Sequence, residues 1–182
     1  MKSKEWLWAA AFIGFVWLSW KAGAKQAPPS RAPALKAEEV SATLTPATAQ
    51  DVKAAFYNGW TDIHGHNPSD ETTAMLLSHS ALETGQWKSM YNWNPGNITT
   101  IHGKFFRLGG GPHQYRAYKT LDEGAKDMIM YLERKHKGAF DELRFGRPDL
   151  YARKLKASGY YEADEDDYAS ALSRIYSQFF KA

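Results

Sequence analysis

The chain has 182 residues, of which 43% are hydrophobic and 14% aromatic, and it contains no cysteine. This length accommodates one ordinary domain with appendages, and the lack of cysteine excludes disulfides, thiolate metal sites and a cysteine nucleophile. The net charge is +3, but residues 51–182 contain 17 basic and 17 acidic residues, so the excess lies in the first 50 residues. Because nucleic-acid-binding domains concentrate basic residues, the balanced charge argues against nucleic acid as a partner.

The first segment of the chain is apolar. Residues 6–20, WLWAAAFIGFVWLSW, contain no charge and carry tryptophans near both ends, as membrane-interface anchors do. Continued through residue 24, a helix would reach about 28 Å, close to the thickness of a hydrocarbon core. We predict a membrane anchor over residues 1–24, with a cleaved signal peptide ending at AGA (22–24) and a buried amphipathic element as the alternatives.

Residues 25–49 differ in composition from the rest of the chain. They contain no aromatic residue and are rich in alanine, proline, serine and threonine. Such a stretch buries too little apolar surface to offset the entropy lost on ordering, so we predict a linker.

Residues 50–182 show the pattern of a compact, mostly helical domain. Apolar side chains at helical spacing predict a first helix over residues 48–64. A second helix is expected to begin at an N-cap, Ser69 or Asp70, and to stop at Gly85.

The second half of this domain alternates between strand and helix signals. Residues 98–118 have β-forming residues on both sides of the glycines 109–111, which predicts a strand pair. The sequence TLDE at residues 120–123 is a capping box that opens a helix. Two more helices are expected, one from Pro148 to a stop at Gly159 and one over residues 166–180. The predicted fold class is therefore mainly α (α+β), with one small β-hairpin.

Glu83 is a solitary carboxylate before a long aromatic-rich stretch, since residues 84–121 contain no aspartate or glutamate. It lies near the C-terminal end of a predicted helix, where the helix dipole is negative and disfavours ionisation of a carboxyl group. A carboxyl group that stays protonated near neutral pH is what a general acid requires. The alternative interpretation is an exposed glutamate that pairs with Lys88.

The segment after Glu83 supplies side chains suited to a sugar. Ligand sites combine aromatic surfaces with a few placed polar groups. Trp87 and Trp93 provide rings, and Asn97 provides an amide. The same aromatic residues could instead belong to the core.

Three stretches together resemble the peptidoglycan N-acetylglucosaminidases of the lysozyme superfamily, of the flagellar-rod and autolysin type. They are SALETGQWKSMYNWNPGNITT (80–100), YRAYKTLDEGAKDMIMYL (115–132) and YARKLKASGYYEADEDDYASALSRIY (151–176). That family pairs an ALESGWG helix end with NLFGIK, an FRxYxS strand followed by xxEgxxDy, and a closing GYATDPxYAxKL. The resemblance covers roughly residues 70–178 in the same order.

The resemblance implies a lysozyme-like bilobal domain that acts on peptidoglycan glycan strands and needs no cofactor or metal. Position by position it makes Glu83 the catalytic acid and puts Tyr160 close to it, with Tyr161 as an equally possible register. It also points to Tyr118 on the strand as a substrate-binding residue, in addition to the candidates Trp87, Trp93 and Asn97.

The sequence departs from the family pattern in two places. NPGNITT (94–100) stands where the family has NLFGIK, and the β region lacks a second carboxylate. A standard inverting or retaining glycosidase needs two carboxyl groups. With one, the sugar must be captured by its own 2-acetamido oxygen or, in muramic acid, by its 6-hydroxyl, as in lytic transglycosylases. Acids at 164–167 folding over the cleft are the other possibility.

Three further features have competing interpretations. His79 shares a helical face with Glu83 and either orients it or is an ordinary buried histidine. The sequence DIHGH (62–66) lacks a third ligand at diagnostic spacing, so we predict no metal. The triple glycine 109–111 is not followed by Lys-Ser/Thr and is better interpreted as a hairpin tip than as a phosphate loop.

We therefore expect a peptidoglycan hydrolase of the N-acetylglucosaminidase type, tethered to a membrane through residues 6–20. Its domain would lie on the periplasmic or extracytoplasmic side, or be carried in a phage virion membrane. The alternatives are a lytic transglycosylase that leaves 1,6-anhydromuramic ends, a non-catalytic peptidoglycan-binding module, and a scaffold domain.

Overall fold

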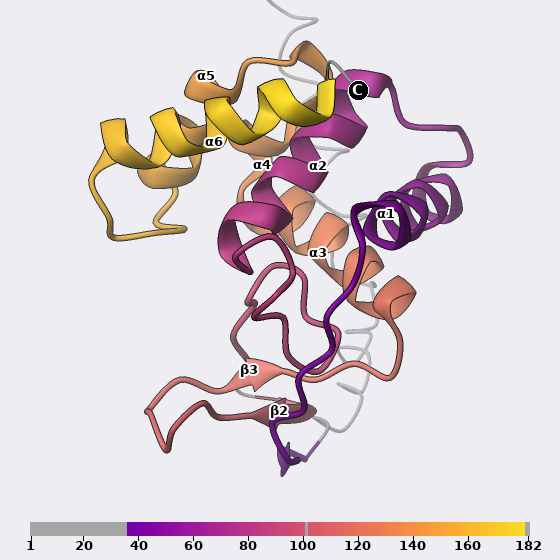
Figure 1. Ribbon diagram of the computed structural model, residues 1–182, viewed down its shortest axis with the longest axis vertical. Coiled ribbons are helices and arrows are strands. Elements are labelled where there is room, and N and C mark those ends of the chain that lie inside the picture. The colour runs from indigo at the N-terminus through magenta and orange to yellow at the C-terminus, as the bar shows by residue number, and fades with distance from the viewer. Residues whose placement is uncertain (1–35, 101, 181–182) are drawn as a thin grey trace, which may run out of the picture. The chain divides into compact units, whose positions relative to one another are not determined.

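The computed structural model describes residues 36–100 and 102–180. The predicted anchor at 1–24 and the first part of the predicted linker lie outside these residues. Within the described ranges, no helix is both long enough and apolar enough to cross a membrane. The elements in chain order are β1 (Glu38–Glu39), α1 (Ala49–His64), α2 (Asp70–Glu83), β2 (Lys104–Phe106), β3 (Tyr115–Arg116), α3 (Leu121–Lys135), α4 (Lys137–Phe140), the 3-10 helix η1 (Leu143–Phe145), α5 (Pro148–Ala157) and α6 (Glu165–Phe180) (Figure 1).

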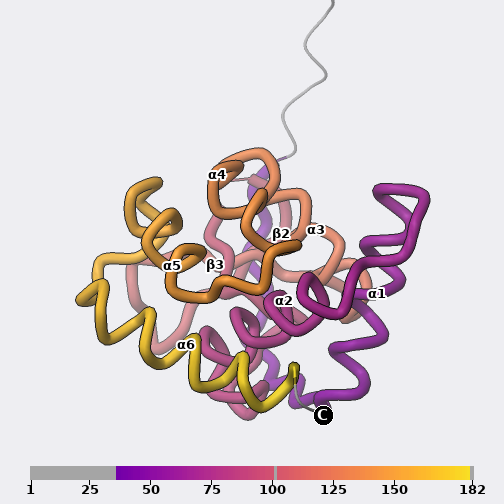
Figure 2. The backbone as a smooth tube through the Cα atoms, turned by 90° about the horizontal axis from the view of Figure 1, so that it is seen from above, coloured from indigo at the N-terminus to yellow at the C-terminus, as the bar shows by residue number. Residues whose placement is uncertain are grey.

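Helix α2 forms the centre of the helical part. Every residue from Thr72 to Ala81 is buried, so this helix is covered all round rather than along one stripe. Helices α1 and α6 and the 3-10 helix η1 pack against it, and α1 also packs on α3. Figure 2 shows α2 between α1 and α6. Each large apolar side chain buried here contributes roughly 1.5–3 kcal/mol to folding, which fixes α2 firmly and with it the residue at its end.

Side-chain caps define where the helices begin. The hydroxyl of Thr48 accepts a hydrogen bond from the backbone N–H of Asp51 at the start of α1. The hydroxyl of Ser69 accepts from Thr72 at the start of α2, and that of Thr120 accepts from Glu123 at the start of α3. Each such cap is worth about 1 kcal/mol. The predicted helices at 48–64, after Ser69 and from 120 are therefore confirmed.

A small sheet lies beyond the C-terminal end of α2 (Figure 1). Its strand order is β1-β2-β3. Strands β2 and β3 are antiparallel, with Phe105 opposite Arg116, and they confirm the strand pair predicted around the triple glycine. Strand β1 pairs in parallel with β2, with Glu38 opposite Lys104. The observed class is mainly helical with a small sheet, as predicted.

The described part of the predicted linker is bound to the domain instead of standing free. The N–H of Val40 donates to the carbonyl of Phe105 at 2.8 Å, and that of Thr45 donates to Met90 at 2.9 Å. The N–H of Thr43 donates to Asn92 Oδ1 at 2.8 Å. The folded unit therefore includes residues from 36 onward, and the predicted boundary at residue 50 is too late. Composition gave no sign of this, because backbone groups make most of these bonds.

Candidate functional site

Glu83 is the last residue of α2, and its backbone is held in place. Helix α2 ends through Thr84, whose N–H donates to the carbonyl of Ser80, and Gly85 follows with a left-handed φ of 56°. The carbonyl of Glu83 accepts a hydrogen bond from the side-chain amide of Asn97. This contact satisfies one of the carbonyl groups that a helix end leaves without an intrahelical partner.

The loop after Glu83 concentrates unfavourable backbone conformations. Within the described residues, all non-glycine positions with positive φ fall between residues 86 and 97. They are Gln86, Trp87, Asn92, Trp93 and Asn97, with φ between 47° and 62°. A left-handed conformation costs roughly 1–2 kcal/mol per residue, and such strain persists where surrounding contacts impose it, often at functional sites.

The buried side chain of Asn94 helps to hold this loop in place through hydrogen bonds. Its Nδ2 donates to the carbonyls of Ile98 and Arg116, and its Oδ1 accepts from the N–H of Ile98 at 3.0 Å. Because Arg116 belongs to β3, this side chain joins the loop after α2 to the sheet.

The carboxylate of Glu83 is partly shielded, with 20% of its side chain exposed. Its Oε1 accepts a hydrogen bond from the hydroxyl of Tyr168 at 2.9 Å. His79 Nε2 lies 3.6 Å from the same oxygen. The other oxygen, Oε2, has no hydrogen-bond partner among the described residues.

His79 lies beneath Glu83 and is fully buried. Its Nδ1 is 2.6 Å from the hydroxyl of Tyr151, which is also fully buried. The structure gives the Tyr151 proton no other acceptor among the described residues, so we assign the hydroxyl as donor and Nδ1 as acceptor. The proton of a neutral His79 is then on Nε2, which faces Glu83. Burial raises the pKa of Tyr151 well above its ordinary value, and the negative charge of Glu83 raises it further. This hydroxyl therefore keeps its proton.

Tyr160 lies in the same cluster. Its ring is edge-on to His79, with 4.8 Å between ring centroids, and its hydroxyl donates to the carbonyl of Gly96 at 3.1 Å. Burial raises its pKa well above the ordinary value, and the negative charge of Glu83 acts in the same direction. The hydroxyl is therefore neutral, and it ties the loop after α2 to the segment between α5 and α6.

Tyr161 and Tyr168 form a stacked pair, with ring centroids 3.8 Å apart and an interplanar angle of 10°. The Tyr161 hydroxyl donates to the carbonyl of Ala152. Sequence reasoning missed Tyr168, although it is the residue that hydrogen-bonds Glu83. The signal was available, since YASAL (168–172) follows GYY (159–161) as YAxKL follows GYA in the family's closing motif, although alanine stands here in place of the lysine.

Trp87 does not offer a face to a ligand. Its side chain belongs to the core at 4% exposure, its indole nitrogen donates to Ser80 Oγ at 2.8 Å, and its ring packs against Phe179. This corrects the expectation that Trp87 binds substrate. Trp93 is half-buried against the same core. The side-chain amide nitrogen of Asn97 donates to the backbone carbonyl of Glu83.

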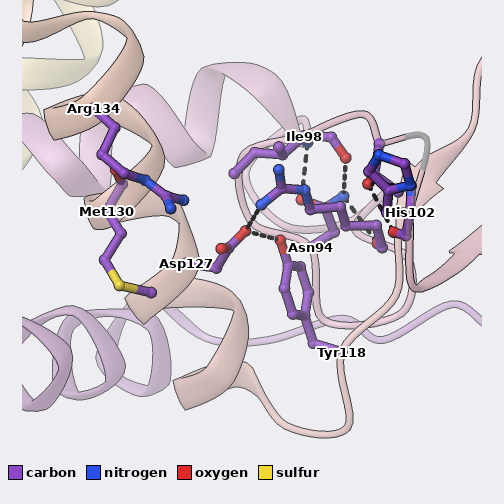
Figure 3. A network of polar contacts seen from close by, with 9 residues as sticks. Asn94, Ile98, His102, Tyr118, Asp127, Met130 and Arg134 are labelled. Atoms are coloured by element: carbon purple, nitrogen blue, oxygen red, sulfur yellow. Dashed lines mark hydrogen bonds and ion pairs between the residues drawn. The ribbon is translucent and has the colours of Figure 1, made fainter. Parts of the chain in front are cut away.

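Tyr118 belongs to a different network from Glu83. Its hydroxyl donates to Asp127 Oδ2 at 2.6 Å, and Arg116 pairs with the same carboxylate. Figure 3 shows Tyr118 pointing at Asp127 of α3. Its pKa is raised far above the ordinary value, first by burial and then by Asp127. The expectation that this hydroxyl meets a sugar beside Glu83 does not fit this placement.

Three acidic residues near this group of tyrosines have other partners. Glu165 and Asp166 both pair with Arg153, and Asp164 Oδ1 accepts from two backbone N–H groups at the start of α6. Among the described residues, Glu83 is the one carboxylate that hydrogen-bonds a member of the group Tyr151, Tyr160, Tyr161 and Tyr168. No group of three or more metal-ligating side chains is placed to hold a metal within those same ranges.

The arrangement combines one partly exposed carboxyl group with neutral hydroxyl groups and a buried imidazole. The Glu83 carboxyl group can donate a proton from Oε2 and then carry a negative charge, because Tyr168 and His79 face Oε1. That capacity is what general acid–base chemistry requires of a single residue.

Comparisons with known proteins found few similarities. No family model matches the sequence, and no curated protein sequence matches it. One solved structure, a peptidoglycan hydrolase mutant from Sphingomonas sp. A1, is similar over 72% of this chain and 98% of that chain. The sequence identity is 20% and the TM-score is 0.45. A likeness at this level establishes no shared activity.

Proposed function

We propose that this chain cleaves the β-1,4 glycan strand of peptidoglycan, with Glu83 as the general acid. The observation that carries the proposal is the placement of Glu83 at the end of a buried helix, with 20% of its side chain exposed. One of its oxygens is bound by Tyr168, and the other has no hydrogen-bond partner in the part of the chain that the structure describes. The resemblance of the segments around Glu83, Tyr160 and Tyr168 to peptidoglycan N-acetylglucosaminidases supplies the substrate class.

In the first step, the proton on Glu83 Oε2 moves to the glycosidic oxygen while the bond from that oxygen to C1 breaks. The leaving sugar departs with a new hydroxyl, and C1 becomes electron-poor. Glu83 is then a carboxylate whose charge is stabilised by the hydrogen bond from Tyr168 to Oε1, with His79 Nε2 at 3.6 Å from the same oxygen. A hydrogen bond to a charged group contributes about 1.5–3 kcal/mol.

The second step uses a group of the sugar, because Glu83 is the one carboxylate, among the described residues, that hydrogen-bonds this group of tyrosines. In the N-acetylglucosaminidase route, the 2-acetamido oxygen attacks C1 to give an oxazolinium ion. Water then opens that ion and returns a proton to Glu83, which leaves a reducing end. This is the route that the sequence resemblance favours.

A lytic transglycosylase is the second candidate, and the single carboxylate favours it. Here the 6-hydroxyl of muramic acid attacks C1, its proton passes to Glu83, and a 1,6-anhydro end forms. No water is consumed. The two routes cut different bonds and leave different ends, so product analysis separates them.

The experiment uses residues 36–182, the range that the fold defines, on purified cell walls. Turbidity should fall and soluble muropeptides should appear. Mass spectrometry before and after borohydride reduction identifies the ends, since a 1,6-anhydro end cannot be reduced. Wall binding without release of any glycan end would contradict catalysis and indicate a binding module.

We also propose that residues 6–20 hold the protein at a membrane, with the domain on the outer side. The support is the uncharged, tryptophan-flanked sequence of that segment. Fractionation of cells that express the full chain is the test. Recovery of uncleaved protein in the soluble cytoplasm would contradict the proposal.

A further inference from the structure

A basic cavity of about 480 Å³ opens beside the sheet. Of the described residues, no acidic one lines it, whereas four basic or imidazole side chains do. The lining residues that matter for binding are Arg116, Lys135, His102, His113 and Tyr131. Two of these side chains, Arg116 and Lys135, carry a permanent positive charge, and Arg116 also pairs with Asp127.

The two permanent cations of the cavity are held differently. The guanidinium of Arg116 forms an ion pair with Asp127, whose carboxylate also accepts a hydrogen bond from the hydroxyl of Tyr118 at 2.6 Å. Its Nε is buried and has no hydrogen-bond partner among the described residues. Lys135 is exposed at the end of α3, and none of the ion pairs among the described residues involves it. A fixed guanidinium beside an uncommitted ammonium suits a ligand carboxylate.

Aromatic contacts connect this cavity to the Glu83 cluster. The Arg116 guanidinium lies 5.7 Å from the Tyr131 ring centroid, and Tyr131 lies 6.4 Å from the ring of Tyr160. Tyr160 in turn contacts His79, which lies beneath Glu83. Three intervening side chains, Tyr131, Tyr160 and His79, thus link the cavity to Glu83.

We propose that this cavity binds a carboxylate of the peptide stem carried by muramic acid, so that the enzyme prefers peptide-bearing glycan strands. The proposal rests on the proposed function, because it assigns the cavity to the same substrate. The neutral lining residues Thr99, Thr100 and Gln114 suit the amide groups of a peptide.

The test is Lys135→Gln, which removes one charge at an exposed position and leaves the Arg116–Asp127 pair intact. Two substrates are compared, intact peptidoglycan and glycan strands whose peptides an amidase has removed. We expect kcat/KM on intact peptidoglycan to fall about tenfold, as for loss of a hydrogen bond to a charged group, with no change on the stripped strands. Lys135→Arg should retain most of the activity. Lys137→Gln, which removes an exposed charge paired with Asp141, is the matched control and should behave like wild type.

A binding measurement keeps the proposal separate from catalysis. The inactive Glu83→Gln variant is titrated by NMR with N-acetylmuramyl-L-alanyl-D-glutamate and with its amidated form. The free acid should bind more tightly, with shifts at Arg116 and Lys135, and Lys135→Gln should abolish the difference. Equal binding of the two forms, or equal effects of Lys135→Gln on both substrates, would overturn the cavity assignment while the proposed function stands. A wild-type protein that cleaves neither substrate contradicts the proposed function instead.

Discussion

At the residue scale, the account depends on how a single carboxylate is supported. Tyr168 donates to Glu83 Oε1 at 2.9 Å, and its own pKa is raised well above the ordinary value by burial and then by Glu83. It therefore remains a hydrogen-bond donor through the whole working pH range. Its neighbour Tyr161 stacks on it but donates to a backbone carbonyl.

Replacing Tyr168 with Phe removes only the hydroxyl that faces Glu83. We expect kcat to fall about 10- to 100-fold, because a hydrogen bond to a charged group contributes about 1.5–3 kcal/mol. The melting temperature should change little. Tyr161→Phe is the control, and it should retain most of the activity because its hydroxyl does not reach Glu83. Equal activity of the two variants would show that the Tyr168 contact has no catalytic role.

At the scale of elements, the start of α3 is pressed against the loop that follows α2. A Cβ added at Gly124 would lie 1.9 Å from the carbonyl oxygen of Trp93 and 2.9 Å from Pro95 Cδ. Only glycine allows this approach. The contact explains how a loop with several left-handed residues stays in one conformation next to Glu83.

Gly124→Ala should therefore destabilise the domain by about 3 kcal/mol, the upper part of the usual range for overpacking. Denaturant unfolding followed by circular dichroism measures the change. Gly138→Ala is the matched control, since its added Cβ would meet nothing closer than Lys154 Cδ at 3.9 Å. That variant should be neutral or slightly more stable. A Gly124→Ala domain as stable as wild type would show that the loop and α3 are not in firm contact.

Residues 36–48 are expected to contribute to stability although their composition is that of a linker. A chain that starts at residue 49 loses the Thr48 cap, worth about 1 kcal/mol, and the backbone bonds to Phe105, Asn92 and Met90. Its melting temperature should be at least about 4 °C below that of residues 36–182. Thr48→Ala in the longer chain isolates the cap and should give a smaller loss. Identical melting temperatures would mean that the segment only rests on the surface.

The parts of this structure that sequence predicts are those set by local chemistry. Thr48, Ser69 and Thr120 mark helix starts because a hydroxyl at that position binds the first turn of its own helix. The position of Glu83 at a helix end follows in the same way from Gly85. Strand β1 could not be predicted, because its partners lie more than 60 residues away. Whether Trp87 or Tyr168 reaches Glu83 depends on the packing of α6, which periodicity does not reveal.

At the scale of the whole molecule, the buried histidine His136 makes stability depend on pH. His136 is 5% exposed, and its pKa is lowered, first by burial and then by the charges of His79 and Lys135. The unfolded chain therefore binds a proton more readily than the folded one, and stability falls as pH drops below about 6.5, the ordinary value for histidine. One such group changes the unfolding free energy by at most about 1.4 kcal/mol per pH unit.

Urea unfolding between pH 8 and pH 5 should show this decline, and His136→Asn should flatten it. Because the Nδ1 of His136 bonds Ser158, the Asn variant is compared with itself across the pH range rather than with wild type at one pH. A variant with the same pH slope as wild type would assign the decline to other groups.

The activity of Glu83→Gln on purified peptidoglycan tests the central claim most directly. The substitution keeps the shape and the hydrogen bond from Tyr168 but removes the proton that Oε2 would donate. Glu71→Gln is the matched control, because it makes the same change in the first turn of the same helix, about 18 Å away. General acid catalysis contributes about 10²–10⁴-fold, so Glu83→Gln should lose at least 99% of the rate of glycan-end release while Glu71→Gln retains it. A folded Glu83→Gln protein with more than about a tenth of the wild-type rate would contradict the assignment of Glu83 as the acid.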